Sequence, residues 1–280
     1  MIIDAHHHLW DPARADYPWL DDSLPTINRP MEFAELEPQL AAAGIDRTVL
    51  VQSANNAGDT QYMLEQATLH PMIAAVVGWV PLDKPELAAA QLDDLQKHPA
   101  FRGIRPGINH DPDADWLLRD DVTEGVRLLA ERGLPFDLVS VRRRHLDLVT
   151  EFSQRHPTLR IVIDHLSKPP VKREDWEPWR TNFARAAENP LVFAKISGVF
   201  PSRGPMDQWI VDDLRPFVDY ALDLFGPDRL MYGSDWPISD LAGGYARVWD
   251  GLNEIFDDLA PADRDAILGG TAARFYSITD

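Results

Sequence analysis

The chain contains no cysteine among its 280 residues, which excludes disulfides, thiolate metal ligands and a cysteine nucleophile. No run of about 18 apolar residues is present to cross a membrane, and the N-terminus lacks the basic and apolar regions of a signal peptide. Basic residues are few, since 27 lysines and arginines stand against 45 acidic residues and the formal net charge is −18. This charge argues against nucleic acid and anionic membranes as partners. We therefore expect a cytoplasmic protein.

The sequence alternates short β-branched runs with amphipathic segments. Its 45% hydrophobic content suffices for a large core. Eight runs have the composition of buried strands: IIDAHHH, RTVLVQS, IAAVVGWVPL, FRGIRPGI, LPFDLVS, RIVIDHL, VFAKISG and RLMYGSDWP. Most intervals between them have helical periodicity, for example EFAELEPQLAAAG and VTEGVRLLAERG. Eight strands joined by helices in a chain of this length predict an α/β fold, a single (β/α)8 barrel domain over residues 1–280.

The junctions between helices and strands repeat two stop signals. Histidine followed by proline ends a predicted helix at His70, His98 and His156, and a glycine suited to a left-handed cap stands at Gly44, Gly133 and Gly226. These three histidines are therefore interpreted as structural. A doubly wound open sheet is the alternative fold, but it usually has a glycine-rich phosphate loop after its first strand. Here the first strand is followed by an aromatic, proline-containing loop, which favours the barrel.

Titratable residues gather at the ends of the predicted strands, where barrel enzymes place their catalytic groups. They are His6, His7 and His8 on the first strand, Arg102 and Arg105 on the fourth, Asp164 and His165 on the sixth, Lys195 on the seventh and Asp235 on the eighth. Together they indicate an active site. Because side chains alternate along a strand, Asp4, His6 and His8 should share one face while His7 points the other way. We expect His6 and His8 at the barrel mouth and a structural role for His7.

Several motifs resemble the amidohydrolase superfamily, in particular its sugar-lactonase branch of L-fuconolactonase- and L-rhamnonolactonase-like proteins. The motifs are Asp4-x-His6-x-His8, DHLSKP around His165, AKISG around Lys195, YGSDWP around Asp235 and GGTAARFY near the C-terminus. The resemblance runs from Ile2 to about Tyr276. It implies a hydrolase in which Asp235 activates the water that opens a small lactone. It also implies that His6, His8 and His165 surround the carbonyl under attack.

The cofactor expectation depends on the same residues. Many amidohydrolases hold two metals bridged by a carboxylated lysine on the fifth strand, whereas LPFDLVS offers Asp137 and no lysine. The resemblance therefore implies at most one divalent cation, with zinc the first choice, held by His6, His8, His165 and Asp235. Such an ion would lower the pKa of a bound water. The same histidines can instead donate directly to the carbonyl, so metal-free catalysis stays open.

Substrate contacts are expected from basic and aromatic side chains. The expected ligands of the lactone carbonyl, hydroxyls or carboxylate are Arg102, Arg105 and Lys195, with Trp10, Tyr17 and Trp19 as an apolar or stacking wall. Pro106 stands where many sugar-lactonase relatives have a histidine, and this departure leaves the substrate open. The oligomeric state is open as well, with a homo-oligomer as one alternative.

Two other functions are compatible with the sequence. The same superfamily contains metal-dependent decarboxylases of aromatic acids, built on similar residues at the strand ends. A barrel that binds a partner without catalysis is the second alternative. Lys195 and the GSDWP and GGTAARFY motifs favour the lactonase.

Overall fold

The structure is a computed structural model that describes residues 1–201 and 204–279. In this part of the chain eight strands form one sheet in sequence order, and each strand pairs in parallel with the next. The strands are β1 (Ile3–His7), β2 (Arg47–Val51), β3 (Ile73–Gly78), β4 (Phe101–Ile104), β5 (Phe136–Leu138), β6 (Ile161–Ile163), β7 (Val192–Ile196) and β8 (Leu230–Tyr232). Each of the eight predicted runs contains one of them. The predicted (β/α)8 barrel is confirmed.

The barrel closes between β1 and the segment that follows β8. His7 forms a parallel bridge with Trp236. The amide of Asp235 donates to the carbonyl of His6 at 2.8 Å, and the amide of His8 donates to the carbonyl of Trp236 at 2.7 Å. Closure therefore places Asp235 directly beside the histidines of β1.

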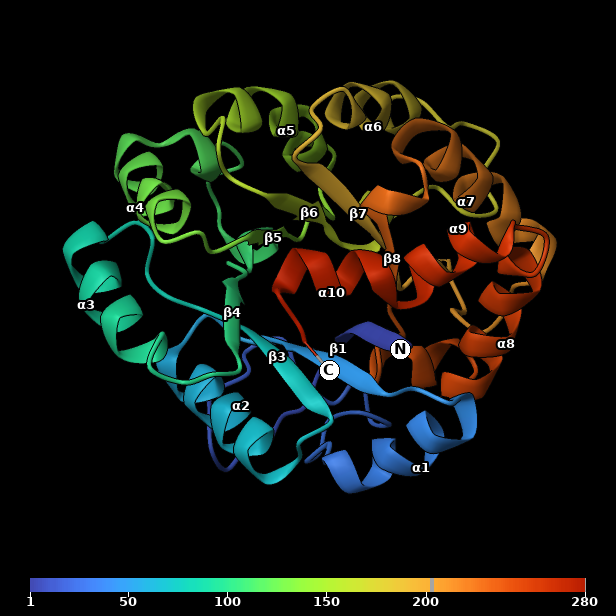
Figure 1. Cartoon of the computed structure of the whole chain (residues 1–280), viewed down its shortest axis with the longest axis horizontal. Coiled ribbons are helices and arrows are strands. Elements are labelled where there is room, and N and C mark those ends of the chain that lie inside the picture. Colours follow the sequence, from blue (N-terminus) through green and yellow to red (C-terminus); the bar gives the residue numbers. More distant parts are fainter. Residues whose placement is uncertain (202–203, 280) are drawn as a thin grey trace.

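Helices surround the strands as a ring (Figure 1). Those of the described residues are α1 (Phe33–Ala43), α2 (Ala57–Leu69), α3 (Pro85–Leu95), α4 (Asp120–Glu131), α5 (Arg143–Arg155), α6 (Trp179–Ala187), α7 (Val211–Phe225), α8 (Tyr245–Phe256), α9 (Pro261–Asp265) and α10 (Thr271–Tyr276). None of them is long and apolar enough to cross a membrane. Gly44 is left-handed as expected, with φ of 69° and ψ of 28°, and Gly133 has a φ of 67°. Gly226 differs from the expectation, because its φ of 66° is combined with an extended ψ of 166°.

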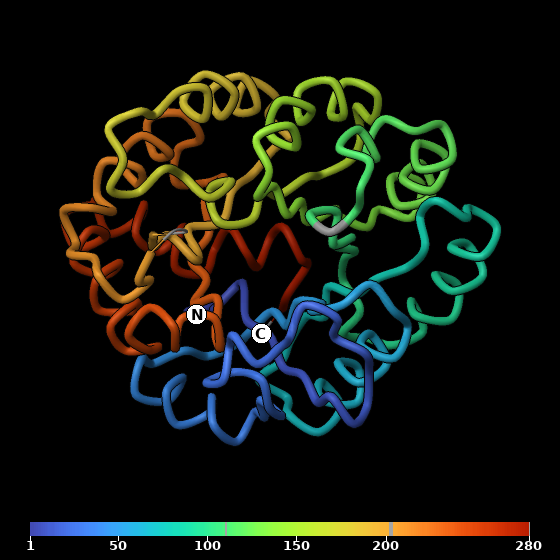
Figure 2. Tube along the Cα trace, turned by 180° about the vertical axis from the view of Figure 1, so that it is seen from behind, coloured from blue at the N-terminus to red at the C-terminus, as the bar shows by residue number. Residues whose placement is uncertain are grey.

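The two ends of the barrel are covered differently. In Figure 1, α10 crosses the end where the strands begin. Its Phe275 and Tyr276 pack with alternate residues of the strands, such as Ile3 and Ala5 of β1, to form the inner core. Figure 2 shows the other end, where the long connection after β1 winds over the ends of the strands. Because α10 covers the first end of the barrel, the functional site is expected at the second end, where the strands finish.

Candidate active site

A pocket of about 680 Å³ opens at the end of the barrel where the strands finish. His8 reaches it from the end of β1, His165 from the turn after β6 and Asp235 from the segment after β8. The other polar lining residues include Gln52, Asn55, Asn56, Arg105, Asn109 and Lys168, and the apolar ones include Trp19, Val139, Val141 and Ile238. Barrel enzymes place their catalytic groups at this end.

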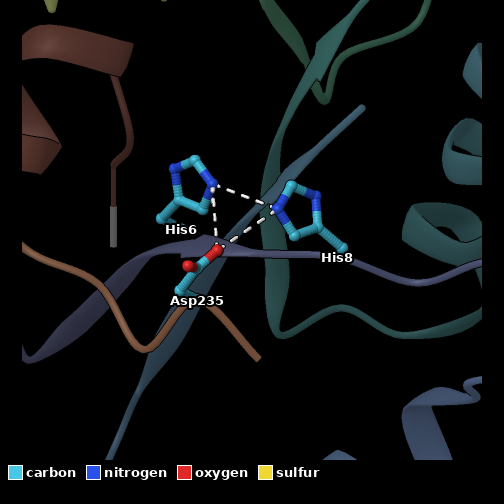
Figure 3. Close-up of side chains that lie close together, drawn as sticks. All are labelled: His6, His8 and Asp235. Atoms are coloured by element: carbon cyan, nitrogen blue, oxygen red, sulfur yellow. Dashed lines mark hydrogen bonds and ion pairs between the residues drawn. The ribbon is translucent and has the colours of Figure 1, made fainter. Parts of the chain in front are cut away.

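His6 of β1, His8 directly after this strand and Asp235 lie close together (Figure 3), and the last two line the pocket. His6 Nε2 lies 3.2 Å from His8 Nε2. Asp235 Oδ1 lies 3.7 Å from the first of these nitrogens and 3.5 Å from the second. His7 points away from them, and its Nε2 lies 2.9 Å from Thr48 Oγ1. The three adjacent histidines therefore alternate as the strand period predicts.

Asp4 does not share this face, and our expectation that it would is wrong. The register of β1 against β2 shifts between Asp4 and His7. The Asp4 carboxylate accepts hydrogen bonds from the amide of Ser234 at 2.9 Å and from the hydroxyl of Tyr245 at 3.2 Å. Burial raises its pKa to about 6. Asp4 therefore links β1 to the segment after β8 and to α8, because the irregular strand turns it outward.

Asp235 presents its two oxygens to different partners. Oδ1 faces the histidines of β1, whereas Oδ2 lies 3.7 Å from His165 Nδ1 and 3.6 Å from Lys168 Nζ. Burial by itself raises the pKa of Asp235, but His165, Lys168 and the β1 histidines hold it well below its ordinary value. Burial lowers the pKa of His165 to about 3 and that of His6 well below its ordinary value. At neutral pH the site therefore combines a carboxylate with neutral imidazoles.

His165 and Lys168 reach Asp235 through a left-handed turn after β6. The φ angles of His165, Leu166, Ser167 and Lys168 are 57°, 47°, 60° and 48°, and the amide of Lys168 donates to the carbonyl of His165 at 2.7 Å. Each left-handed residue with a side chain costs about 1–2 kcal/mol. Such strain persists where surrounding contacts demand it, often at functional sites. Here the turn brings residues three apart in sequence to the same carboxylate oxygen.

Lys168, which we did not predict, also belongs to the site. The Lys168 ammonium donates to the carbonyl of Gly198 at 3.2 Å and lies 5.0 Å from the ring centre of Phe200. Its side chain is 19% exposed, and burial lowers its pKa. No glycine marks the left-handed turn. The one available signal was the DHLSKP motif itself, in which a lysine follows a strand-end histidine by three positions.

Gly198, which follows β7, was missed as well. Its φ is +53°, and a β-carbon at this position would lie 2.4 Å from Asp235 Oδ2, 2.8 Å from Lys168 Nζ and 2.9 Å from His165 Nδ1. The absence of a side chain is therefore what lets these three groups converge. This close approach accounts for the glycine of the AKISG motif.

Lys195 is placed differently from our expectation of a substrate ligand. Its side chain is 0% exposed and does not line the pocket. Its ammonium donates to Asp137 Oδ2 at 2.6 Å and lies 3.3 Å from Asp164 Oδ1. Tyr276 of α10 donates to the same Asp137 oxygen at 2.7 Å. Lys195 therefore belongs to a charged layer beneath the pocket, because β7 directs it into the barrel interior.

The charged layer has the pKa shifts expected of buried ion pairs. Burial raises the pKa of Asp137 to about 6, although Lys195 opposes this shift. The pKa of Asp164 is well below its ordinary value, because Lys195, His6 and Arg105 outweigh the effect of burial. Asp164 is therefore a carboxylate at neutral pH.

The other three predicted substrate ligands differ in their positions. Arg105 lines the pocket and pairs through Nε with Asp164 Oδ2 at 2.8 Å. Trp10 is fully buried, and its ring lies 5.1 Å from that of Trp19, which lines the pocket in its place. Arg102 lines a separate cavity of about 170 Å³ with Phe275 and Tyr276. It stands near the start of β4, so it lies at the opposite end of the barrel and cannot reach the pocket.

The cluster has the composition of a metal site. Two sets of side chains each have ligand atoms within 4.8 Å of one another: His6 with His8 and Asp235, and His6 with Asp164 and His165. Neutral imidazoles and carboxylates are ligands that zinc prefers. His8 also has the hydrogen bond typical of a metal ligand, because its Nδ1 lies 2.7 Å from the carbonyl of Val51. The residues therefore fit one divalent cation.

Comparison with known proteins identifies the family. The amidohydrolase family model matches residues 3–278. Curated L-fucono-1,5-lactonases of Burkholderia ambifaria and Burkholderia multivorans are 39% and 33% identical, over 99% and 100% of this chain and 95% and 97% of their own. A crystal structure of a Burkholderia multivorans amidohydrolase with bound zinc has a TM-score of 0.92 and 32% identity, with complete coverage of both chains.

Decarboxylases are less similar. A crystal structure of 2,6-dihydroxybenzoate decarboxylase has 15% identity and a TM-score of 0.66, over 99% of this chain and 98% of its own. This likeness shows a common fold and nothing of the reaction. From its first strand to its last helix, the chain belongs to the amidohydrolase family.

Proposed function

We propose that the protein is a hydrolase that opens a small lactone, with a six-membered sugar-acid lactone of the L-fucono-1,5 type as the first candidate. The likeness to two curated lactonases along the whole chain supports this reaction. The single observation that carries the mechanism is the position of Asp235. It is a carboxylate at the pocket, with the neutral imidazole of His6 beside Oδ1 and that of His165 beside Oδ2.

The hydrolytic step uses Asp235 as the base. A water beside Asp235 attacks the lactone carbonyl carbon while the carboxylate accepts its proton. The carbonyl oxygen then carries negative charge, which the Lys168 ammonium and the Arg105 guanidinium, both lining the pocket, stabilise as donors. The bond between the carbonyl carbon and the ring oxygen breaks, and Asp235 returns the proton to the departing alkoxide. Lactone and water thus become one hydroxy acid.

The pocket suits a small polyhydroxylated ring. Its volume of about 680 Å³ exceeds what a single sugar lactone occupies, so the ligand and several waters fit together. Trp19, Val139 and Ile238 provide an apolar wall on which a ring can lie. Gln52 supports Arg105 through two hydrogen bonds. The side-chain Nε2 of Gln52 donates to the backbone carbonyl of Arg105 at 2.6 Å, and the backbone carbonyl of Gln52 accepts from Arg105 Nη1 at 2.8 Å. The arginine is thus held in place before substrate binds.

One divalent cation, zinc before others, would be held by His6, His8 and Asp235, with His165 beside them. A bound ion of this kind lowers the pKa of a water ligand. The metal-free alternative uses the same residues, with the histidines donating directly to the carbonyl. The absence of cysteine and the acidic composition support placing this enzyme in the cytoplasm.

A pH-indicator assay over aldonolactones and dicarboxylate lactones tests the reaction, because ring opening releases an acid. We expect turnover of a 1,5-sugar lactone and a loss of about 10²–10⁴ in kcat for Asp235→Asn, which keeps the shape and removes the base. A chelator arm decides whether a metal is needed. Turnover of aromatic acids with release of CO2, and of no lactone, would instead support the decarboxylase.

A further inference from the structure

The Lys195 ammonium lies within an enclosed group of acceptors. It stands 2.6 Å from Asp137 Oδ2, 3.1 Å from His6 Nδ1 and 3.3 Å from Asp164 Oδ1, and the lysine, the histidine and both carboxylates are fully buried. An ammonium has three N–H donors and no acceptor. Toward Lys195, His6 Nδ1 can therefore act only as an acceptor.

Asp164 also approaches His6 Nδ1 and could accept a proton from this nitrogen. Its Oδ1 lies 3.3 Å from His6 Nδ1, within ion-pair distance. Among the described residues, neither Asp164 oxygen has an aligned hydrogen-bond donor, whereas the contact between Lys195 and His6 has hydrogen-bond geometry. The geometry therefore favours the bond from Lys195, with His6 Nδ1 unprotonated.

The contacts of His8 agree with a hydrogen bond from Lys195 to His6 Nδ1. A neutral imidazole with a bare Nδ1 carries its proton on Nε2, and His6 Nε2 lies 3.2 Å from His8 Nε2. His8 Nδ1 lies 2.7 Å from the carbonyl oxygen of Val51, which can only accept, so the His8 proton is on Nδ1. Donors and acceptors then match from Lys195 through His6 and His8 to Val51.

We propose that Lys195 is a positioning residue that holds His6 in the tautomer protonated on Nε2, and that it thereby weakens metal binding by His6, His8 and Asp235. A histidine that binds a metal usually donates its second ring N–H to a carboxylate or a carbonyl. His8 has this arrangement. His6 instead faces an ammonium, so its Nε2 lone pair becomes available only after the proton moves to Nδ1, toward Asp164.

The tautomer can be measured on the unaltered protein. Long-range ¹⁵N–¹H NMR of metal-stripped protein labelled in histidine distinguishes the two ring nitrogens, and the spectrum of His6→Gln identifies the His6 signals by their loss. We expect a protonated Nε2 and a bare Nδ1. A His6 proton on Nδ1 would overturn the proposal.

Metal affinity tests the consequence. Removing Lys195 alone would leave the buried Asp137 carboxylate without its cation, so Lys195→Met is combined with Asp137→Asn and compared with Asp137→Asn alone. We expect the double variant to bind zinc about 10- to 100-fold more tightly in competition with a chromophoric chelator, and its His6 proton to move to Nδ1. Unchanged or weaker zinc binding would contradict the proposal.

A charge control is needed, because removing any nearby cation favours zinc. Lys168→Met removes an ammonium that lies 3.6 Å from Asp235 and donates to the carbonyl of Gly198, not to His6. We expect a smaller gain in zinc affinity and an unchanged His6 tautomer. Equal gains in Lys168→Met and in the Lys195 variant would show that charge alone sets the affinity, and would refute the role of Lys195. If the double variant does not fold, as judged by circular dichroism, the NMR result on the native protein decides.

Discussion

The α-carbon of Gly198 faces the Asp235 carboxylate, and the space between them admits a hydrogen but not a methyl group. A β-carbon at position 198 would lie 2.4 Å from Asp235 Oδ2. We expect Gly198→Ala to displace the carboxylate and lower kcat about 10²-fold, because small displacements of reacting groups are costly. Gly133→Ala is the matched control, since its φ of +67° imposes a similar backbone cost while nothing lies within 4 Å of its β-carbon. Equal activity of the two variants would contradict this account.

Asp235 should remain ionised throughout the working pH range. Its pKa is depressed in the folded protein, so its contribution to stability is present above the unfolded value near 3.8 and is lost as pH falls below that value. We therefore expect no acid limb from Asp235 in kcat/KM between pH 5 and 8. The pH profile of kcat/KM for Asp235→Asn should have the same shape between pH 5 and 8, with much lower values of kcat/KM. An acid limb near pH 6 that disappears in the variant would contradict this.

Lys168 should set an alkaline limb. Burial lowers its pKa from the ordinary value of 10.5, so the ammonium present at neutral pH is lost as pH rises through a window that begins below 10.5. We expect Lys168→Met to lower kcat about 10²–10³-fold through loss of a donor to the oxyanion. Lys168→Arg should remove the alkaline limb, since a guanidinium stays charged. A pH profile of kcat/KM for the three proteins is the measurement, and an identical alkaline limb in Lys168→Arg would exclude the assignment.

Arg105 and Arg102 should differ in their importance for substrate. Arg105 lines the pocket, whereas Arg102 lines the cavity at the other end of the barrel. We expect Arg105→Lys to lower kcat/KM about 10–100-fold, because it loses the fork-shaped donor group and weakens bonds to a charged oxygen. Arg102→Lys should stay within about twofold of the parent enzyme. Similar losses in both variants would mean that the pocket is not the substrate site.

Asp59 supports the pocket wall and gives stability a pH dependence. It accepts from the hydroxyl of Tyr17 at 2.9 Å and from the amides of Ser53 and Ala54 at 2.8 and 3.2 Å. Burial raises its pKa from 3.8 to about 6, so the folded state binds more protons in that window and its stability falls as pH rises through it.

The substitution Asp59→Asn would remove this titration, while the amide oxygen of the new side chain still accepts from the backbone. We therefore expect the difference in unfolding free energy between Asp59→Asn and the parent protein to change by about 2 kcal/mol between pH 4 and pH 6.5. Urea unfolding at the two values measures it. A difference that is constant with pH would show that the Asp59 proton is not linked to folding.

Local patterns were sufficient to predict the barrel and the position of its active end. Strand period, helical periodicity and caps such as Gly44 depend on neighbouring residues, so they can be read without a fold. The alternation of His6, His7 and His8 followed from the same period. Arg105 and Asp235 could be placed near these histidines because the ends of parallel strands meet at one edge.

Contacts between distant segments decided the rest. The register shift in β1 turned Asp4 away from the site. The pairing of Lys195 with Asp137, 58 residues earlier in the chain, made it an interior cation that does not line the pocket. Lys168 joined the site through a left-handed turn with no glycine, and three side chains converge on Gly198, where a β-carbon would not fit. Such features have no local pattern, because the cost of strain or buried charge is compensated by groups that meet only in the folded barrel.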